Sequence, residues 1–121
     1  MRSDLKARTK RFALDIVRLY SALPKRTEAQ VLGRQMLRSG TSVGAHYHEA
    51  QRAKSNADFI SKIEGGLQEL EETGYRLDLL NEAGFVPVEA FNRLKQETDE
   101  LIGIFVSIVR KTRSRVKTPR L

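Results

Sequence analysis

The two histidines of the chain, His46 and His48, are the residues best suited to metal binding or acid–base chemistry. On a helix, side chains two positions apart point about 200° away from each other, so these two imidazoles cannot bind one metal ion. Metal sites in helical bundles also place a glutamate three residues before a histidine, and neither histidine has one. The sequence therefore predicts no metal site and no cofactor.

Nucleolytic chemistry can be assessed in the same way. Some all-helical ribonucleases place a histidine a few residues after an arginine, but seven residues separate Arg38 from His46 and nine separate it from His48. The chain has no cysteine, which excludes thiol catalysis and disulfides. It also lacks a glycine-rich phosphate loop and a serine nucleophile motif. We expect a protein that is not an enzyme.

A further polar set consists of Arg38, Ser42 and Glu49, which share one face if their segment is helical. A later segment carries Glu69, Glu72 and Tyr75. One interpretation is a polar pocket. The favoured one is a hydrogen-bonded layer that fixes the register of two helices, because arginine and carboxylates pair well in that role.

Four amphipathic helices are expected to position these residues. The first runs from Asp4 or Thr9 to Ala22 and the second, capped by Thr27, runs to about Ala53. A capping box at 55–58 opens the third, Gly84 ends it, and Pro87 starts the fourth. Strand-like alternation is absent. The pattern predicts an all-α fold, an antiparallel up-down-up-down bundle.

Each expected helix has an apolar face. The predicted core residues are Phe12, Ile16, Leu19 and Leu23; Val31, Leu32, Met36, Leu37, Val43 and Tyr47; Phe59, Ile63, Leu67, Leu70, Leu77 and Leu80; and Phe91, Leu94, Thr98, Leu101, Phe105 and Ile108. The second helix also holds Gly33, Gly40 and Gly44, each costing about 1 kcal/mol relative to alanine. These glycines predict close approach by another backbone or a local break.

Charge is concentrated at the two ends of the chain. Residues 1–18 carry six basic side chains against two acids, and residues 110–121 carry six against none. The middle is mildly acidic, although the whole chain has a formal charge of +7. Basic segments neutralise phosphates in a salt-dependent way, whereas the plainer interpretation is a solvated surface. The longest apolar stretch, 102–109, is too short to span a bilayer, so we expect a cytoplasmic protein without a membrane partner.

The run from Leu37 to Ala50, LRSGTSVGAHYHEA, resembles the signature of a known family. Residues 9–14, 23–25, 55–62 and 69–80 match the same family in the right order. The chain is similar to the bacterial four-helix-bundle proteins, also called the 23S ribosomal RNA intervening-sequence protein family. One departure is Arg76, where relatives often have tryptophan.

The resemblance implies a left-handed bundle that assembles into a homopentamer with a non-enzymatic role. Some relatives are encoded inside 23S ribosomal RNA genes. Others are accessory variability proteins of diversity-generating retroelements, which bind nucleic acid and a reverse transcriptase. The residues that match the family's signature positions are assigned to structure: Arg38, Ser42 and Glu49.

Two functions remain open at this point. The first is an oligomeric protein that binds RNA or DNA, or acts as a scaffold, through largely sequence-independent phosphate contacts. The expected contacts are Lys6, Arg8, Lys10, Arg11, Arg110, Lys111, Arg113, Arg115 and Lys117. The alternative is a protein-interaction module that docks a partner such as a reverse transcriptase, with no direct nucleic-acid role. The expected organisation is one domain, residues 1–116, and a flexible basic tail, residues 117–121.

Overall fold

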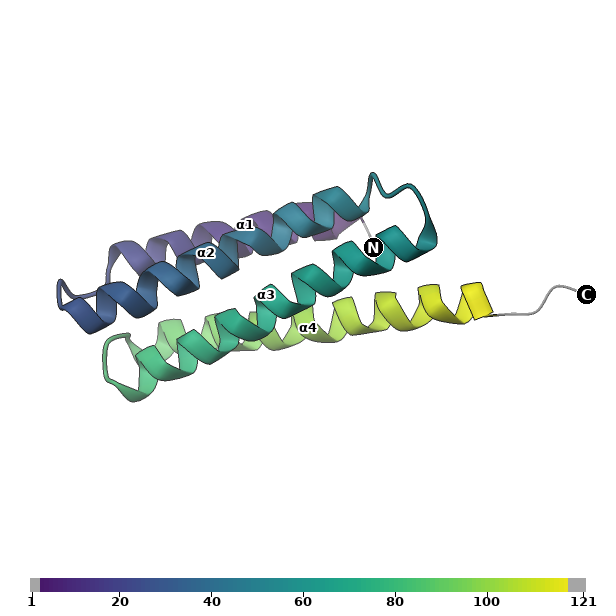
Figure 1. Ribbon diagram of the computed structural model, residues 1–121. Helices are drawn as coiled ribbons and strands as arrows, with labels where there is room; N and C mark the ends of the chain where they lie inside the picture. Colours follow the sequence, from purple (N-terminus) through teal and green to yellow (C-terminus); the bar gives the residue numbers. More distant parts are fainter. Residues whose placement is uncertain (1–2, 118–121) are drawn as a thin grey trace, which may run out of the picture.

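The computed structural model describes residues 3–117, with side chains from Asp4 to Arg115. Within that range the chain forms four helices and no strand: α1 (Ser3–Ser21), α2 (Thr27–Ala50), α3 (Asn56–Glu82) and α4 (Val88–Lys117). The helices run alternately up and down (Figure 1). The predicted all-α antiparallel bundle is confirmed. Lys117 ends α4, so most of the expected tail lies outside the described residues.

The ends of α3 follow their sequence signals closely. The hydroxyl of Ser55 accepts a hydrogen bond from the Asp58 amide at 3.0 Å, which caps the first turn. At the other end Gly84 has a φ of 79°, its amide donates to the carbonyl of Asn81, and the Phe85 amide donates to Leu80. This pair of bonds is a Schellman motif, which satisfies carbonyls left unpaired at a helix end.

Two predicted helix starts were wrong by one residue. Thr27 does not cap α2: the N-cap is Arg26, in extended backbone, and its side chain makes no capping hydrogen bond. Pro87 precedes α4 instead of occupying its first turn, and its carbonyl accepts from the Phe91 amide at 3.0 Å. α2 also ends at Ala50, three residues earlier than expected.

Most of the predicted core is buried between the four helices. Phe12, Ile16, Met36, Leu70 and Phe105 are almost completely inaccessible, and they belong to one continuous apolar cluster. Partly exposed residues that pack against that cluster are Leu32, Leu37, Phe59, Leu67 and Phe91. The prediction for Val31 was wrong: its side chain is exposed on the outer side of α2.

The glycines of α2 bring this helix close to α1 without breaking it. A β-carbon at Gly40 would lie 2.9 Å from the Ile16 side chain, and one at Gly44 would lie 3.2 Å from the Thr9 hydroxyl. One at Gly33 would overlap Leu23. These glycines therefore make room mainly for side chains of α1 and of Leu23 after it, and the one backbone atom within 4 Å is the Thr9 carbonyl carbon, 3.8 Å from a β-carbon at Gly44.

The seam between α1 and α4 is the thinnest of the helix contacts around the bundle, as far as residues 3–117 describe it. A groove follows it, and it is lined by Leu5, Gly103, Ile104, Ile108 and Lys111, among others. In Figure 1 the described end of α4 projects beyond the start of α1, on the same side of the molecule. None of the helices between residues 3 and 117 is long and apolar enough to cross a membrane.

Candidate nucleic-acid interface

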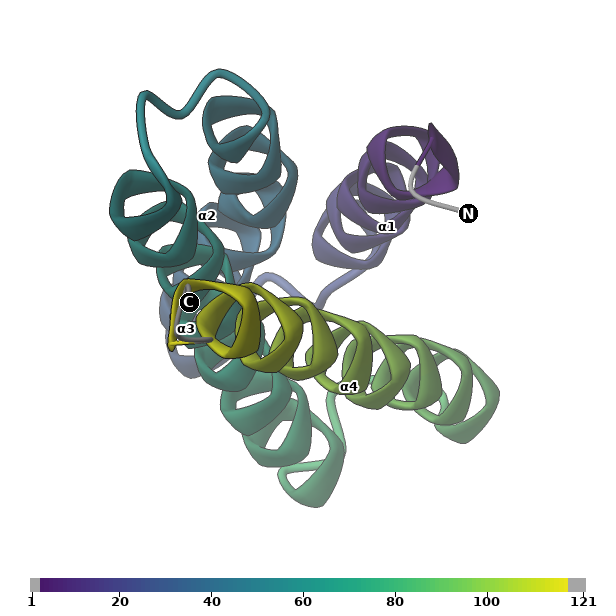
Figure 2. The ribbon, with the colours of Figure 1, turned by 90° about the vertical axis from the view of Figure 1, so that its right-hand side faces the viewer.

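One end of the bundle collects the basic residues from both ends of the chain. The start of α1 and the described end of α4 face the viewer in Figure 2, as does the turn between α2 and α3. The antiparallel order causes this, because an even number of helices returns the chain to the end where it began. The exposed cations of the first half of α1 and the last third of α4, apart from the ion-paired Arg113, are Lys6, Lys10, Arg11, Arg110, Lys111 and Arg115. We call these six the terminal cations. Lys10 and Arg11 lie near the middle of α1, where Arg11 lines a hollow with residues 93–100 of α4, and the other four belong to turns nearer this end.

Arg8 lies among these residues but is already paired with two carboxylates. Its guanidinium donates to both oxygens of Glu97, at 2.7 and 2.8 Å, and to Glu100 at 2.7 Å. The hydrogen bond to Glu97 raises the pKa of Arg8 above its ordinary value, and burial opposes this rise in part. Arg8 therefore joins α1 to α4 across the thin seam.

Arg113 is engaged in a similar way. Its guanidinium donates to Glu64 on α3 at 2.7 Å, with both side chains about half exposed. The charge of Arg113 is thus balanced within the chain. Lys117, the last of the expected phosphate contacts, has a side chain outside the described residues.

The signature residues lie on the opposite side of α2 from α1. Arg38 donates to Glu72 at 3.3 Å and lies 3.8 Å from Glu69, so it connects α2 to α3. The Ser42 hydroxyl donates to the Arg38 carbonyl at 2.6 Å within the same helix. Only the contacts of Arg38 therefore join α2 to α3, and the Ser42 hydrogen bond lies within α2. Glu49 is exposed and forms no ion pair within the described residues, so its contacts do not place it in the predicted layer.

His46 is a member of this polar layer that the sequence did not indicate. Its Nε2 lies 3.6 Å from Oε2 of Glu69, while His46 Nδ1 and Glu69 Oε1 are buried without hydrogen-bond partners among the described residues. Space for the ring comes from Gly65 and Gly66, since a β-carbon at Gly65 would lie 2.7 Å from the imidazole. The glycine pair in the middle of α3 was the signal that could have revealed this contact.

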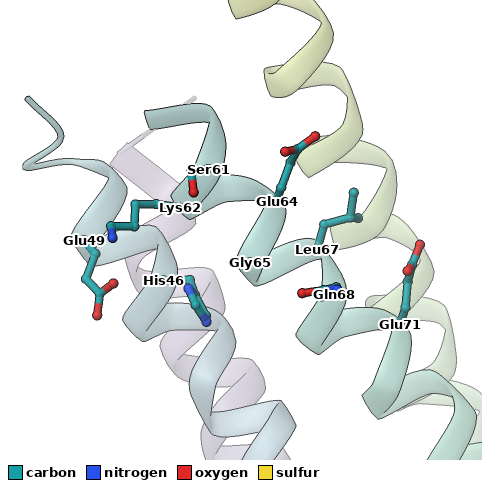
Figure 3. Close-up of a pocket in the computed structure, with 9 residues that line it drawn as sticks. All are labelled: His46, Glu49, Ser61, Lys62, Glu64, Gly65, Leu67, Gln68 and Glu71. Carbon is teal, nitrogen blue, oxygen red and sulfur yellow. The ribbon is translucent and has the colours of Figure 1, made fainter. Parts of the chain in front are cut away.

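A shallow hollow beside His46 does not gather catalytic groups. Its lining residues come from α2 and α3, and Figure 3 shows that Glu64 and Glu71 point away from the imidazole. Glu49 and Lys62 lie at its other edge. Among residues 3–117, no group of three or more potential metal ligands comes together. The hollow thus lacks the convergent set that a hydrolytic site requires.

Comparisons with known proteins identify the family. The family model described as "23S rRNA-intervening sequence protein" matches residues 2–107. A crystal structure from Bacteroides thetaiotaomicron VPI-5482, described as a protein with unknown function from the S23 ribosomal protein family, is 38% identical. It superposes with a TM-score of 0.81, over 86% of this chain and 96% of that chain. A comparison with curated proteins found no match. The chain belongs to the 23S rRNA-intervening sequence protein family.

Proposed function

We propose that this chain is a non-enzymatic protein that binds nucleic acid through the terminal cations of α1 and α4. The observation that carries the proposal is the presence of six exposed cations on these two helices, four of them in turns near the end of the bundle where the start of α1 and the described end of α4 lie. Lysine and arginine neutralise backbone phosphates and release counterions, which gives an attraction independent of sequence.

The ion pairs reduce the set of residues proposed to contact phosphate, because two of the basic residues already have a carboxylate partner. Arg8 and Arg113 each have a carboxylate partner at 2.7 Å, so a phosphate would have to displace that partner. We therefore assign both arginines to bundle structure. The terminal cations form no ion pair with an acidic side chain within the described residues, so they are the proposed phosphate contacts.

Oligomerisation is part of the same proposal. A ring of copies, the homopentamer that the family resemblance implies, would repeat the basic end several times, so that weak phosphate contacts combine into useful avidity. The molar mass of the purified chain, measured by light scattering after size exclusion, tests this. A monomer at micromolar concentration would contradict the proposed ring.

Binding is tested by fluorescence anisotropy of labelled RNA, DNA and hybrid duplexes across a salt series. The double variants K10A/R11A and R110A/K111A each remove one lysine and one arginine. Each is expected to reduce the slope of log affinity against log salt by up to about 2. The matched control is K25A/R34A, which removes two exposed cations located away from the terminal end and is expected to leave the slope unchanged. Absence of binding at low salt would overturn the proposal.

A second candidate is a protein-docking module, and the groove between α1 and α4 favours it. Leu5, Ile104 and Ile108 line that groove, and Gly103 leaves its floor open, since a β-carbon added to this glycine would meet no described atom within 4 Å. Polar and charged residues (Asp4, Arg8, Glu100, Ser107 and Lys111) line the rest of the groove, so a partner helix that fits it would be amphipathic. Recovery of a protein partner that survives nuclease treatment, with loss of that partner in I104E, would favour this function over nucleic-acid binding.

A further inference from the structure

The turn between α2 and α3 carries two more exposed cations, Arg52 and Lys54. The backbone of this turn is held by hydrogen bonds: the Arg52 amide donates to the Glu49 carbonyl at 3.0 Å, and the Lys54 amide donates to Asp58 at 3.2 Å. Neither side chain forms an ion pair within the described residues. The turn therefore presents two cations to solvent on an ordered backbone.

The turn that carries these two cations lies at the same end of the bundle as the start of α1 and the described end of α4. Figure 2 looks onto this end and shows these three backbone segments toward the viewer. The ion pair between Arg113 and Glu64 ties the last turns of α4 to the first turns of α3, and so to this turn. Two distant parts of the sequence and one internal turn thus share one basic surface.

The size of this surface indicates what kind of ligand fits it. Packed helices lie about 8–10 Å apart, so cations on three corners of a bundle are spread over a distance on the order of 10 to 20 Å. One phosphate cannot reach all three groups. A duplex carries one charge per ~1.7 Å of its axis, so several phosphates fall within that span.

We propose that Arg52 and Lys54 form a third phosphate-contacting group, so that this end of the bundle binds several phosphates of one nucleic-acid molecule at the same time. This inference rests on the proposed function. It adds a segment that the charge distribution along the sequence did not single out, because α2 before the turn is neutral and α3 after it carries seven acidic side chains against two basic ones.

The experiment measures anisotropy of a labelled duplex RNA, a duplex DNA and the corresponding single strands, each across a salt series, with the full chain. The variant R52A/K54A keeps both backbone amides of the turn. It is expected to reduce the salt slope by about 2 for the duplexes, as each terminal double variant does. The control K25A/R34A removes the same two residue types outside the basic end. Circular dichroism confirms that each variant folds.

The outcomes distinguish this inference from the function on which it rests. If the terminal variants lose slope while R52A/K54A binds like the wild type, the turn assignment is wrong and the proposed function stands. If the wild-type chain binds no nucleic acid at low salt, both proposals fail together. The inference is supported if an RNA or DNA duplex binds the wild-type chain and the salt slope of that binding is smaller for R52A/K54A but unchanged for K25A/R34A.

Discussion

Arg8 on α1 and Glu97 on α4 are 89 positions apart, and two parallel hydrogen bonds of 2.7 and 2.8 Å join them. The planar guanidinium matches both carboxylate oxygens, and a third bond reaches Glu100. Both side chains of the main pair are only about a quarter exposed. This contact bridges the first and last helices where their apolar packing is thinnest.

Replacing Arg8 by alanine is expected to destabilise the bundle by about 1 kcal/mol, because two carboxylates lose their partner in a partly buried setting. Arg8→Lys keeps the charge but loses the paired geometry, so it should fall between the wild type and alanine. Urea unfolding followed by helical circular dichroism measures both changes. Lys10→Ala, exposed on the same helix, is the control; an equal loss there would refute a specific role for Arg8.

The Glu100 carboxyl is expected to contribute to the loss of folding stability at acidic pH. Hydrogen bonds from Gln96 and then from Arg8 lower the pKa of Glu100 below its ordinary value of 4.5. A carboxyl with a lowered pKa in the folded state stabilises the fold above its unfolded pKa, and this contribution is lost as the pH falls through the folded value.

Glu100→Gln removes that titration. Its melting temperature should therefore fall less steeply than that of the wild type between about pH 5 and about pH 3. Thermal melts at matched ionic strength check this. Parallel curves for the two proteins would show that the Glu100 charge has no such role.

Gly66 and Gly103 are both helical, yet alanine should have opposite effects at the two positions. A β-carbon at Gly66 would lie 2.7 Å from the ring of Phe105, which is fully buried, and overpacking of this kind costs about 1–3 kcal/mol. At Gly103 no described neighbouring atom lies within 4 Å, so alanine should stabilise α4 by up to about 1 kcal/mol. Urea midpoints of G66A and G103A test this pair, and a shift in the same direction for both would contradict it.

Ser39 on α2 and Thr73 on α3 form a buried hydroxyl pair at 2.7 Å. Each hydroxyl also has a carbonyl acceptor in its own helix, Glu69 at 2.7 Å for Thr73 and Met36 at 3.2 Å for Ser39, so either hydroxyl can be the donor within the pair. Removing one hydroxyl leaves the other less well satisfied, whereas removing both avoids that cost. In a double-mutant cycle, S39A and T73V should therefore show a coupling of about 1 kcal/mol. Additive single effects would show that the two hydroxyls act independently.

The helices and the core could be predicted from the sequence because both depend on local signals. Ser55, Gly84 and the apolar spacing of Phe12 and Ile16 each act within one or two turns of their own helix. Whether a basic side chain is ion-paired or free depends on tertiary packing instead. In the sequence Arg8 and Arg113 are indistinguishable from free charges, and only the bundle brings carboxylates from other helices to them.

The polar side chains between α2 and α3 also divide into those that local helical spacing indicates and those that depend on tertiary packing. Helical spacing placed Arg38 and Ser42 on one face correctly, but it could not show that His46 enters the same layer. That contact requires Gly65 on the neighbouring helix to leave room for the imidazole, and helix register across the α2–α3 interface is not encoded by spacing within either helix.

The thin seam between α1 and α4 has a consequence for how the chain folds. Every other helix contact joins elements that are consecutive along the sequence, so most native contacts close short loops, and folding should be fast. Among the helix contacts of residues 3–117, the α1–α4 seam alone joins the first helix to the last, so it can form only when the whole described chain has come together. Hydrogen exchange should therefore find the outer helices α1 and α4 opening before the central α2–α3 hairpin, with amide protection highest in that hairpin.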